Sequence, residues 1–314
     1  MIRQKVMNEN KTRKHRKKLS RNQKSLLMVT LLLLGLAVLV YPDIANRIQN
    51  NRHHAILQEY SDEIANMEAE VIAYELERAR IHNNSLGGIQ AVDPFAPGSG
   101  SVIFMEYYSI LNLNDVMGRI EIPIIDVDLP IFHGTSSSVL ERGVGHVNHT
   151  PFPIGGYGNH SLLSAHTGMV SARMFTDLQL LEIGDIFIVT VLNNRIAFQV
   201  DRIDTVLPHE IELLVSYDDR DLITLITCTP YGVNTYRLLV RGERIEYIPY
   251  MADEIDDILR TLNIRLMILI VFVIFCVIIT VFYNHRRKQK LEVALRKIQI
   301  EREYQELVRS NLKM

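Results

Sequence analysis

Cysteine is scarce in this sequence of 314 residues, and its placement limits what it can do. Cys276 lies inside a long apolar run, so Cys228 is the one cysteine in the more polar middle of the chain. A single cysteine cannot form an intramolecular disulfide, so the middle is not a disulfide-stapled domain. Cys228 is therefore either a small buried hydrophobe or a reactive thiol.

Lysine is missing from the whole middle of the chain. All ten lysines lie before residue 25 or after residue 283, and residues 42–265 contain 31 acidic residues, 15 arginines and no lysine. The formal net charge of -2 therefore hides an acidic middle between two basic ends. The basic runs flank apolar segments, which explains them without a nucleic acid, so we expect no nucleic-acid partner.

Two long apolar runs contain no charge and predict two membrane-spanning helices. The first covers residues 25–41 and the second covers residues 266–283. Each is close to the shortest stretch that crosses a bilayer as a helix. No small-residue cleavage site follows the first run, which favours an uncleaved anchor over a signal peptide. Because the flanking basic residues lie toward the two chain ends, we expect a two-pass protein of the cell membrane, with both ends cytoplasmic and the middle extracytoplasmic.

The middle of the chain changes from a helical to a strand pattern. Apolar residues recur mostly at three-, four- or seven-residue steps over 44–81, which predicts a helical stalk. A loop rich in proline and glycine follows, and its apolar residues are expected to pack on the domain. Many short runs rich in Ile, Val, Leu, Tyr and Thr come next, with one short helix at 171–181. The fold class is therefore mainly β, a barrel or a sandwich.

These patterns divide the chain into eight consecutive parts. They are a basic cytoplasmic tail (1–24), a transmembrane helix (25–41), an extracytoplasmic helical stalk (42–84), a loop (85–102), a β domain (103–250), a juxtamembrane segment (251–265), a second transmembrane helix (266–283) and a second basic cytoplasmic tail (284–314).

Cys228 and Arg237 are expected to lie close together. Residues 222–228 and 235–241 read as neighbouring antiparallel strands, and the cysteine ends the first while the arginine lies near the start of the second. Side chains alternate between the two faces of a strand, so both residues can share one face. A guanidinium there would hold a carbonyl oxygen or stabilise developing negative charge. An ordinary surface arginine is the alternative.

A nucleophilic cysteine needs a proton acceptor, which is usually histidine. The middle of the chain supplies nine histidines, so sequence spacing does not choose among them. His166 ends a predicted strand, where a base is exposed yet positioned. His133 and His146 follow strands or glycine turns and stay open as alternatives.

A metal site would be the competing use of many histidines and carboxylates. The spacings do not support it, because there is no HExxH motif and no pair of cysteines. His146 and His149 form a single weak pair. We expect no metal and no other cofactor.

Several of these segments resemble one family. Thr-Leu-Ile-Thr-Cys (224–228), followed by Arg237, resembles the TLxTC…R signature of sortases, the surface-protein transpeptidases of Gram-positive bacteria. Residues 164–178 resemble the segment with that family's catalytic histidine, and 131–156 resemble the preceding stretch in class C, the pilus-associated sortases. Asp93-Pro94-Phe95 resembles the lid of class C, which also has a second C-terminal apolar span.

This resemblance implies a fold and a site. The fold is the eight-stranded sortase β-barrel with N-terminal helices and a lid loop, flanked by the two transmembrane helices. Cys228 becomes the nucleophile, His166 the acid and base, and Arg237 the residue that holds the substrate or its oxyanion, with support from Thr227. His133 and His146 become structural.

The lid assignment also comes from the resemblance. Asp93 would lie toward the arginine and Phe95 over the cysteine, with Pro94 between them. The family commonly has arginine after the catalytic histidine, where this chain has Thr167. We do not expect that departure to affect the chemistry.

The implied reaction is acyl transfer. The thiolate cleaves an LPxTG-like sorting signal between Thr and Gly, and an amine, expected to be a lysine of another pilin, resolves the thioester and polymerises the pilus. The first alternative is a sortase that anchors surface proteins to peptidoglycan. A cysteine protease and a non-catalytic membrane-anchored binding domain with a buried Cys228 are further alternatives.

Overall fold

The computed structural model describes residues 21–86, 93–96, 105–169, 171–214, 217, 219–248, 274 and 285–304. The chain divides into two compact units, Met1–Tyr247 and Ile248–Met314. The second unit is described mainly as a helical stretch over 285–304. The first unit contains every strand that the structure describes.

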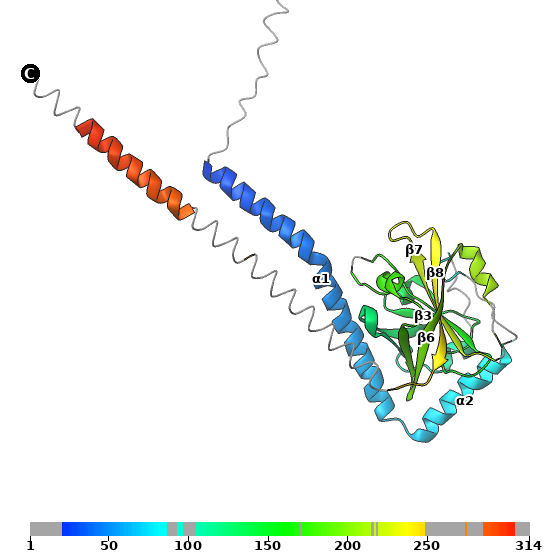
Figure 1. The fold of residues 1–314 in the computed structure, drawn as a ribbon. Helices are drawn as coiled ribbons and strands as arrows, with labels where there is room; N and C mark the ends of the chain where they lie inside the picture. The colour runs from blue at the N-terminus through cyan, green and yellow to red at the C-terminus, as the bar shows by residue number, and fades with distance from the viewer. Residues whose placement is uncertain are drawn as a thin grey trace, which may run out of the picture. The chain divides into compact units, whose positions relative to one another are not determined.

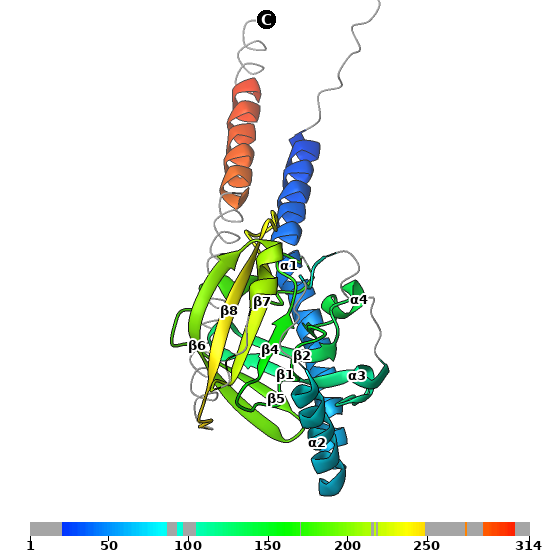
Figure 2. The same ribbon diagram turned by 90° about the vertical axis from the view of Figure 1, so that its right-hand side faces the viewer.

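The centre of the first unit is a closed eight-stranded barrel with the strand order β1-β2-β3-β4-β7-β8-β6-β5. Figure 2 shows β6, β8, β7 and β4 following one another across one side of it. The strands are β1 (Val116–Ile122), β2 (Val127–His133), β3 (Val144–His146), β4 (His160–Ser164), β5 (Ile186–Val191), β6 (Asn194–Val206), β7 (Leu222–Thr229) and β8 (Tyr236–Ile245). The predicted eight-stranded barrel is confirmed.

Strand length and alternation explain how the barrel closes. β6 is 13 residues long, so residues 194–199 pair with β5 while residues 197–206 pair with β8. Every second residue of a strand points inward, and the barrel interior is filled by apolar side chains such as Leu225, Val240 and the stacked rings of Phe187 and Phe198. A closed barrel leaves no unpaired sheet edge.

The α-helices lie along one side of the barrel (Figure 2). They are α1 (Arg21–Ala65), α2 (Ala69–Ser85), α3 (Met105–Ser109) and α4 (Ser137–Leu140). The described residues also form the 3-10 helices η1 (Pro123–Ile125), η2 (Thr176–Leu180) and η3 (Pro208–Leu213). The buried face of α1 is a helical stripe of His53, Leu57, Tyr60 and Ile64. The hydroxyl of Tyr60 donates to the Met117 carbonyl at 3.1 Å and so ties α1 to β1.

The prediction of a single helix over 44–81 is wrong in one respect, because the helix is interrupted between α1 and α2. The end of α1 tightens into i→i−3 hydrogen bonds from Asn66 and Met67. Glu68 then adopts an extended backbone with ψ of 143° and is the N-cap residue of α2, which begins at Ala69. The break turns the chain, so that α2 continues in another direction (Figure 1).

The short helix predicted over 171–181 is largely replaced by irregular structure. Met174 has a φ of 44°, which a right-handed helix cannot contain. Only η2 winds into a 3-10 turn, and it buries Phe175 and Leu178 against the barrel core. Burial of these two side chains, rather than helical periodicity, shapes the segment.

In the part of the chain that the structure describes, no helix is long and apolar enough to cross a membrane. The span predicted over 25–41 falls within α1 and is not confirmed as a membrane helix. The span predicted over 266–283 lies outside the described residues apart from Ile274.

Candidate active site

Strands β7 and β8 bring Cys228 and Arg237 together. Their antiparallel register places Cys228 directly opposite Arg237. Opposed residues extend to the same side of a sheet. The alternating neighbours Leu238 and Val240 belong to the core inside the barrel, so the cysteine and the arginine lie on its outer face.

His166 reaches the same place from another part of the chain. It follows β4, which runs parallel to β7 with Ser164 beside Ile226. The N–H of Ala165 donates to the carbonyl of Ile226 at 3.2 Å, so pairing continues past the end of the strand. Extending this register by two residues places His166 level with Cys228.

The backbone around His166 is held from two sides. The hydroxyl of Thr227 donates to the carbonyl of Ala165 at 2.8 Å. The N–H of Phe175 donates to the carbonyl of His166 at 3.1 Å. Thr227 is buried and faces the residue before the histidine, so it can act by positioning rather than by touching a substrate.

Asp93 forms a bidentate ion pair with Arg237. The guanidinium donates from Nε and Nη2 to the two carboxylate oxygens, both at 2.8 Å. Its Nη1 donates to the backbone carbonyls of Asn234 and Tyr236. The side chains of Arg237 and Asp93 are 8% and 11% exposed, so water screens this pair little. The arginine is therefore occupied by the loop.

Asp93, Pro94 and Phe95 form one compact turn. The N–H of Ala96 donates to the Asp93 carbonyl at 3.1 Å, and the N–H of Phe95 donates to the Asp93 carboxylate at 3.3 Å. Proline suits the second position of such a turn because its φ is preset. The turn carries the carboxylate and the phenyl ring as one unit.

Phe95 contacts both residues that flank the cysteine. The centroid of the Phe95 ring is 5.6 Å from the centroid of the His166 ring. The Arg237 guanidinium carbon lies 5.2 Å from the centroid of the Phe95 ring. The ring also packs on an apolar cluster outside the barrel that includes Leu162, Ile226 and Leu239. The lid residues thus occupy the face on which Cys228 lies.

The pKa values of the Cys228 thiol and the His166 imidazole are shifted in opposite directions from their ordinary values. Burial raises the pKa of Cys228 above 9.0, Arg237 lowers it, and the Asp93 carboxylate raises it further. Burial lowers the pKa of His166 below 6.5, which Glu141 partly offsets. At neutral pH both groups are therefore mainly uncharged while Asp93 is in place.

His133 and His146 lie in a buried aromatic cluster beneath α3. Nε2 of His133 donates to the Ile110 carbonyl at 2.7 Å. Nε2 of His146 donates to the Pro151 carbonyl at 2.9 Å, so its Nδ1 accepts from the Tyr107 hydroxyl at 2.8 Å. Desolvation lowers the pKa of His133 to about 4 and that of His146 to about 3. Both histidines are built into the core.

Sequence reasoning did not single out two polar features of the outer face. The buried hydroxyl of Ser164 has no hydrogen-bond partner among the described residues. Nε2 of His160 and the hydroxyl of Thr224 lie 2.7 Å apart. Neither feature has a motif of its own, and only the side-by-side placement of β4 and β7 reveals them. Across the described residues, no group of three His, Cys, Asp or Glu side chains could hold a metal ion.

Comparisons with known proteins agree on one family. The sortase domain family matches residues 120–245. The crystal structure of sortase C-1 from Actinomyces oris is 44% identical with a TM-score of 0.54, and the match covers 57% of this chain and 99% of that one. The pilus-related sortase C of Group B Streptococcus is 36% identical with a TM-score of 0.57, and the match covers 60% and 97%.

A curated relative matches over a shorter range. Sortase A of Streptococcus agalactiae is 30% identical over 132 residues, which make up 41% of this chain and 52% of that relative. The chain thus matches about half the length of this relative.

The two solved sortases are 44% and 36% identical to this chain and are matched over 99% and 97% of their lengths, so this β-barrel protein is of the sortase class. The chain belongs to the sortase family, and its structural neighbours include class C sortases of pilus systems.

Proposed function

We propose that this protein is a cysteine transpeptidase that joins pilin subunits. The observation that carries the proposal is the convergence of His166, Cys228 and Arg237 on one outer face, under a lid turn that occupies the arginine. Membership of the sortase family supports acyl transfer as the reaction class.

In the first half-reaction the Cys228 thiolate attacks the carbonyl of Thr in an LPxTG-like sorting signal. Arg237, released from Asp93, donates to the carbonyl oxygen as negative charge develops on it. Protonated His166 gives its proton to the leaving amine of Gly. The Thr–Gly bond breaks, and a thioester between Thr and Cys228 forms.

In the second half-reaction an amine attacks the thioester. His166 takes the proton of the attacking amine, an isopeptide bond forms, and the cysteine leaves as a thiolate. The proposed amine is a lysine of a second pilin, because the structural neighbours include pilus sortases and the chain has the lid turn. A peptidoglycan amine is the second candidate. No step needs a metal or an organic cofactor.

The proposal includes membrane anchorage. The uncharged runs 25–41 and 266–283, each flanked by basic residues on the side of the chain end, support a two-pass protein of the cell membrane with the barrel outside. Its partners are then the membrane and pilin or surface proteins that carry the sorting signal.

The test is to mix the full-length protein in detergent with candidate pilins and look for covalent ladders on denaturing gels. Ladders that require Cys228 and disappear in Cys228→Ala are the expected result. Normal ladders from Cys228→Ala would refute catalysis by this residue. Cleaved products that end in a free carboxylate, with no amine transfer, would instead indicate a protease.

A further inference from the structure

The outer face that carries Cys228 continues down the barrel in regular rows. β7 pairs with β4 on one side and with β8 on the other, so every second residue of the three strands lies on this face. From the cysteine downward the rows are His166–Cys228–Arg237, Ser164–Ile226–Leu239 and Leu162–Thr224–Arg241. The described lid residues contact the first two rows.

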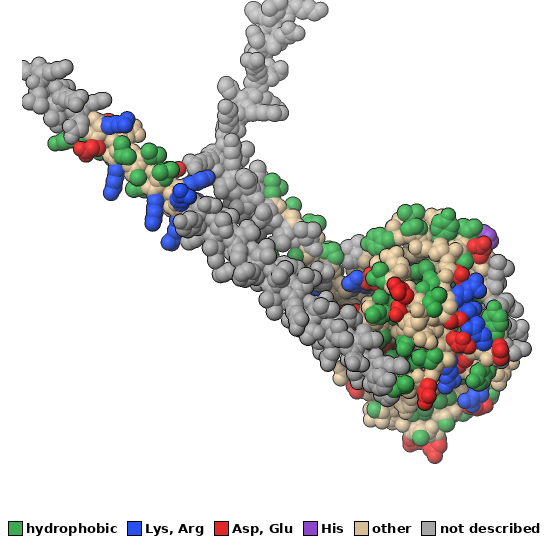
Figure 3. Space-filling view, in the orientation of Figure 1, with side chains coloured by type: hydrophobic (Ala, Val, Ile, Leu, Met, Phe, Trp, Pro, Cys, Tyr) green, Lys and Arg blue, Asp and Glu red, His purple; other side chains and the backbone are tan. Residues whose placement is uncertain are grey.

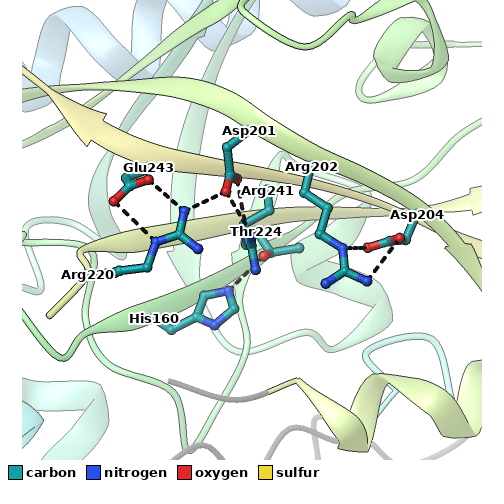
Figure 4. A network of polar contacts seen from close by, with 8 residues as sticks. All are labelled: His160, Asp201, Arg202, Asp204, Arg220, Thr224, Arg241 and Glu243. Carbon is teal, nitrogen blue, oxygen red and sulfur yellow. Dashed lines mark hydrogen bonds and ion pairs between the residues drawn. The ribbon is translucent and has the colours of Figure 1, made fainter. Parts of the chain in front are cut away.

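A cavity of about 370 Å³ lies over the third row. Val206, Leu214 and Tyr217 contribute to its wall, and Thr224, Arg241 and His160 also line it. Figure 4 shows His160 directed at Thr224, next to Arg241. The cavity thus combines apolar walls with a polar floor, which is the usual make-up of a ligand site.

The arginine in the cavity is held rigidly. Arg241 donates from Nε and Nη2 to the two carboxylate oxygens of Asp201, at 3.0 and 2.7 Å. Asp201 also accepts from Arg220, which in turn pairs with Glu243 (Figure 4). Since Nη1 of Arg241 makes no hydrogen bond to another described residue, this edge can donate to a ligand.

The basic and acidic side chains that line the cavity are equal in number. Arg202 and Arg241 are matched by Asp204 and Glu210, and Arg202 is paired directly with Asp204. Figure 3 shows the same mixing of acidic and basic side chains on the visible face of the barrel. A ligand with a net charge would be desolvated there without a compensating excess of opposite charge. The cavity therefore favours a neutral polar group.

The distance from the cysteine says which part of a peptide reaches the cavity. Thr224 is four residues from Cys228 along β7, about 13 Å at the rise of a strand. An extended peptide covers that distance in about four residues. The residues of the sorting motif up to the attacked carbonyl therefore cover the upper rows, and the residue just before the motif is level with Thr224 and Arg241.

We propose that this cavity is a subsite for the residue that precedes the sorting motif and that it prefers a neutral amide side chain, such as glutamine. The proposal rests on the proposed function. The amide oxygen accepts from Arg241, whose side chain is partly exposed, whereas Thr224 is fully buried against His160 beneath it. The side-chain methylenes pack on Leu214 and Tyr217.

The test is peptide binding to the full-length chain carrying Cys228→Ala, which prevents turnover, and Asp93→Ala, which removes the competing carboxylate. The probes are peptides Ala-Ala-Xaa-Leu-Pro-Ala-Thr-Gly-Ala in which Xaa is Gln, Glu, Lys or Ala. We expect the Gln peptide to bind about fivefold more tightly than the Ala peptide, which is the net worth of a hydrogen bond or two. Added Arg241→Gln should abolish this preference.

Two matched variants separate recognition from misfolding. Thr224→Ser keeps the hydroxyl and should keep the preference. Arg119→Gln removes another arginine that forms a bidentate pair, with Asp128, and should change nothing. Equal binding of all four peptides, tightest binding of the Glu or Lys peptide, or a preference that survives Arg241→Gln would overturn the subsite.

Cleavage of the same peptides distinguishes a failure of the proposed function from a failure of the subsite. If the chain carrying Asp93→Ala alone cleaves none of the four peptides and joins none to an amine, the transpeptidase is wrong. If it processes all four with the same kcat/KM, the transpeptidase stands and the subsite is wrong.

Discussion

At the scale of residues, the central observation is that Cys228 and His166 are shifted in opposite directions. Burial stabilises the neutral thiol and the neutral imidazole, so the pKa of the cysteine lies above that of the histidine. The form needed for the proposed chemistry, thiolate with imidazolium, is then a minor species at every pH. Its fraction is greatest between the two pKa values.

A bell-shaped dependence of kcat/KM on pH follows. Activity should fall below the pKa of His166, because the thiolate fraction keeps decreasing while the imidazolium fraction is saturated. It should fall again above the pKa of Cys228, because the imidazolium is lost. The acidic limb is expected below pH 6.5 and the basic limb near or above pH 9. Steady-state cleavage of a quenched sorting peptide over pH 5–10 measures this, and a single rise with no basic limb would contradict it.

At the scale of elements, the lid turn both covers the residues around Cys228 and raises the pKa of its thiol. Asp93 occupies Arg237 and also raises the pKa of Cys228, after the larger effect of burial. Phe95 packs on His166. One turn of the chain therefore blocks the arginine, contacts the imidazole and disfavours the thiolate.

Asp93→Ala should increase the rate at which a small thiol reagent labels Cys228 several-fold at pH 8. Loss of the carboxylate frees Arg237 to stabilise the thiolate and releases the turn from the groove. Labelling followed by mass spectrometry, across pH, should show the profile displaced to lower pH. Asp128→Ala breaks another bidentate pair, with Arg119, and serves as the control. Equal rates in Asp93→Ala and Asp128→Ala would argue against occlusion by the lid.

At the scale of the whole molecule, buried histidines join the helices to the barrel. Tyr107 of α3 bonds to His146 of β3, while Asn83 of α2 donates to the Phe152 carbonyl at 3.1 Å and accepts from its N–H at 2.7 Å. His133 of β2 holds the end of the α3 segment through Ile110. Both chain segments that flank the lid thus depend on this cluster.

The free energy of unfolding should fall as the pH drops from about 6.5 to about 4. His133 and His146 titrate near 4 and 3 when folded and near 6.5 when unfolded, so the unfolded chain binds more protons in this range. A loss of a few kcal/mol is expected by pH 4, and urea unfolding at several pH values measures it. His146→Gln should flatten the slope, whereas His209→Gln, an exposed change on η3, should not. An identical slope in His146→Gln would contradict the assignment.

Much of this protein could be predicted from local sequence pattern. Alternation along 222–228 and 235–241 was enough to place Cys228 and Arg237 on one face, because hairpin-like neighbours need only short-range information. The same pattern predicted a mainly β domain. Helix limits were less accurate, since Met174 and Glu68 take backbone conformations that burial and turning of the chain impose.

The sequence by itself thus determined the lone thiol, its cross-strand arginine and the acidic, lysine-free middle of the chain. Local sequence pattern left the histidine open and only the family resemblance pointed to His166, since the position of this residue depends on the parallel pairing of β4 with a strand about 60 residues further on. The resemblance also implied that Asp93 lies toward Arg237, and the tertiary structure shows that contact across a separation of 144 residues. Only the tertiary structure shows that Thr224 and Arg241 share a cavity. These contacts arise from closure of the barrel, which brings together side chains that no local periodicity relates.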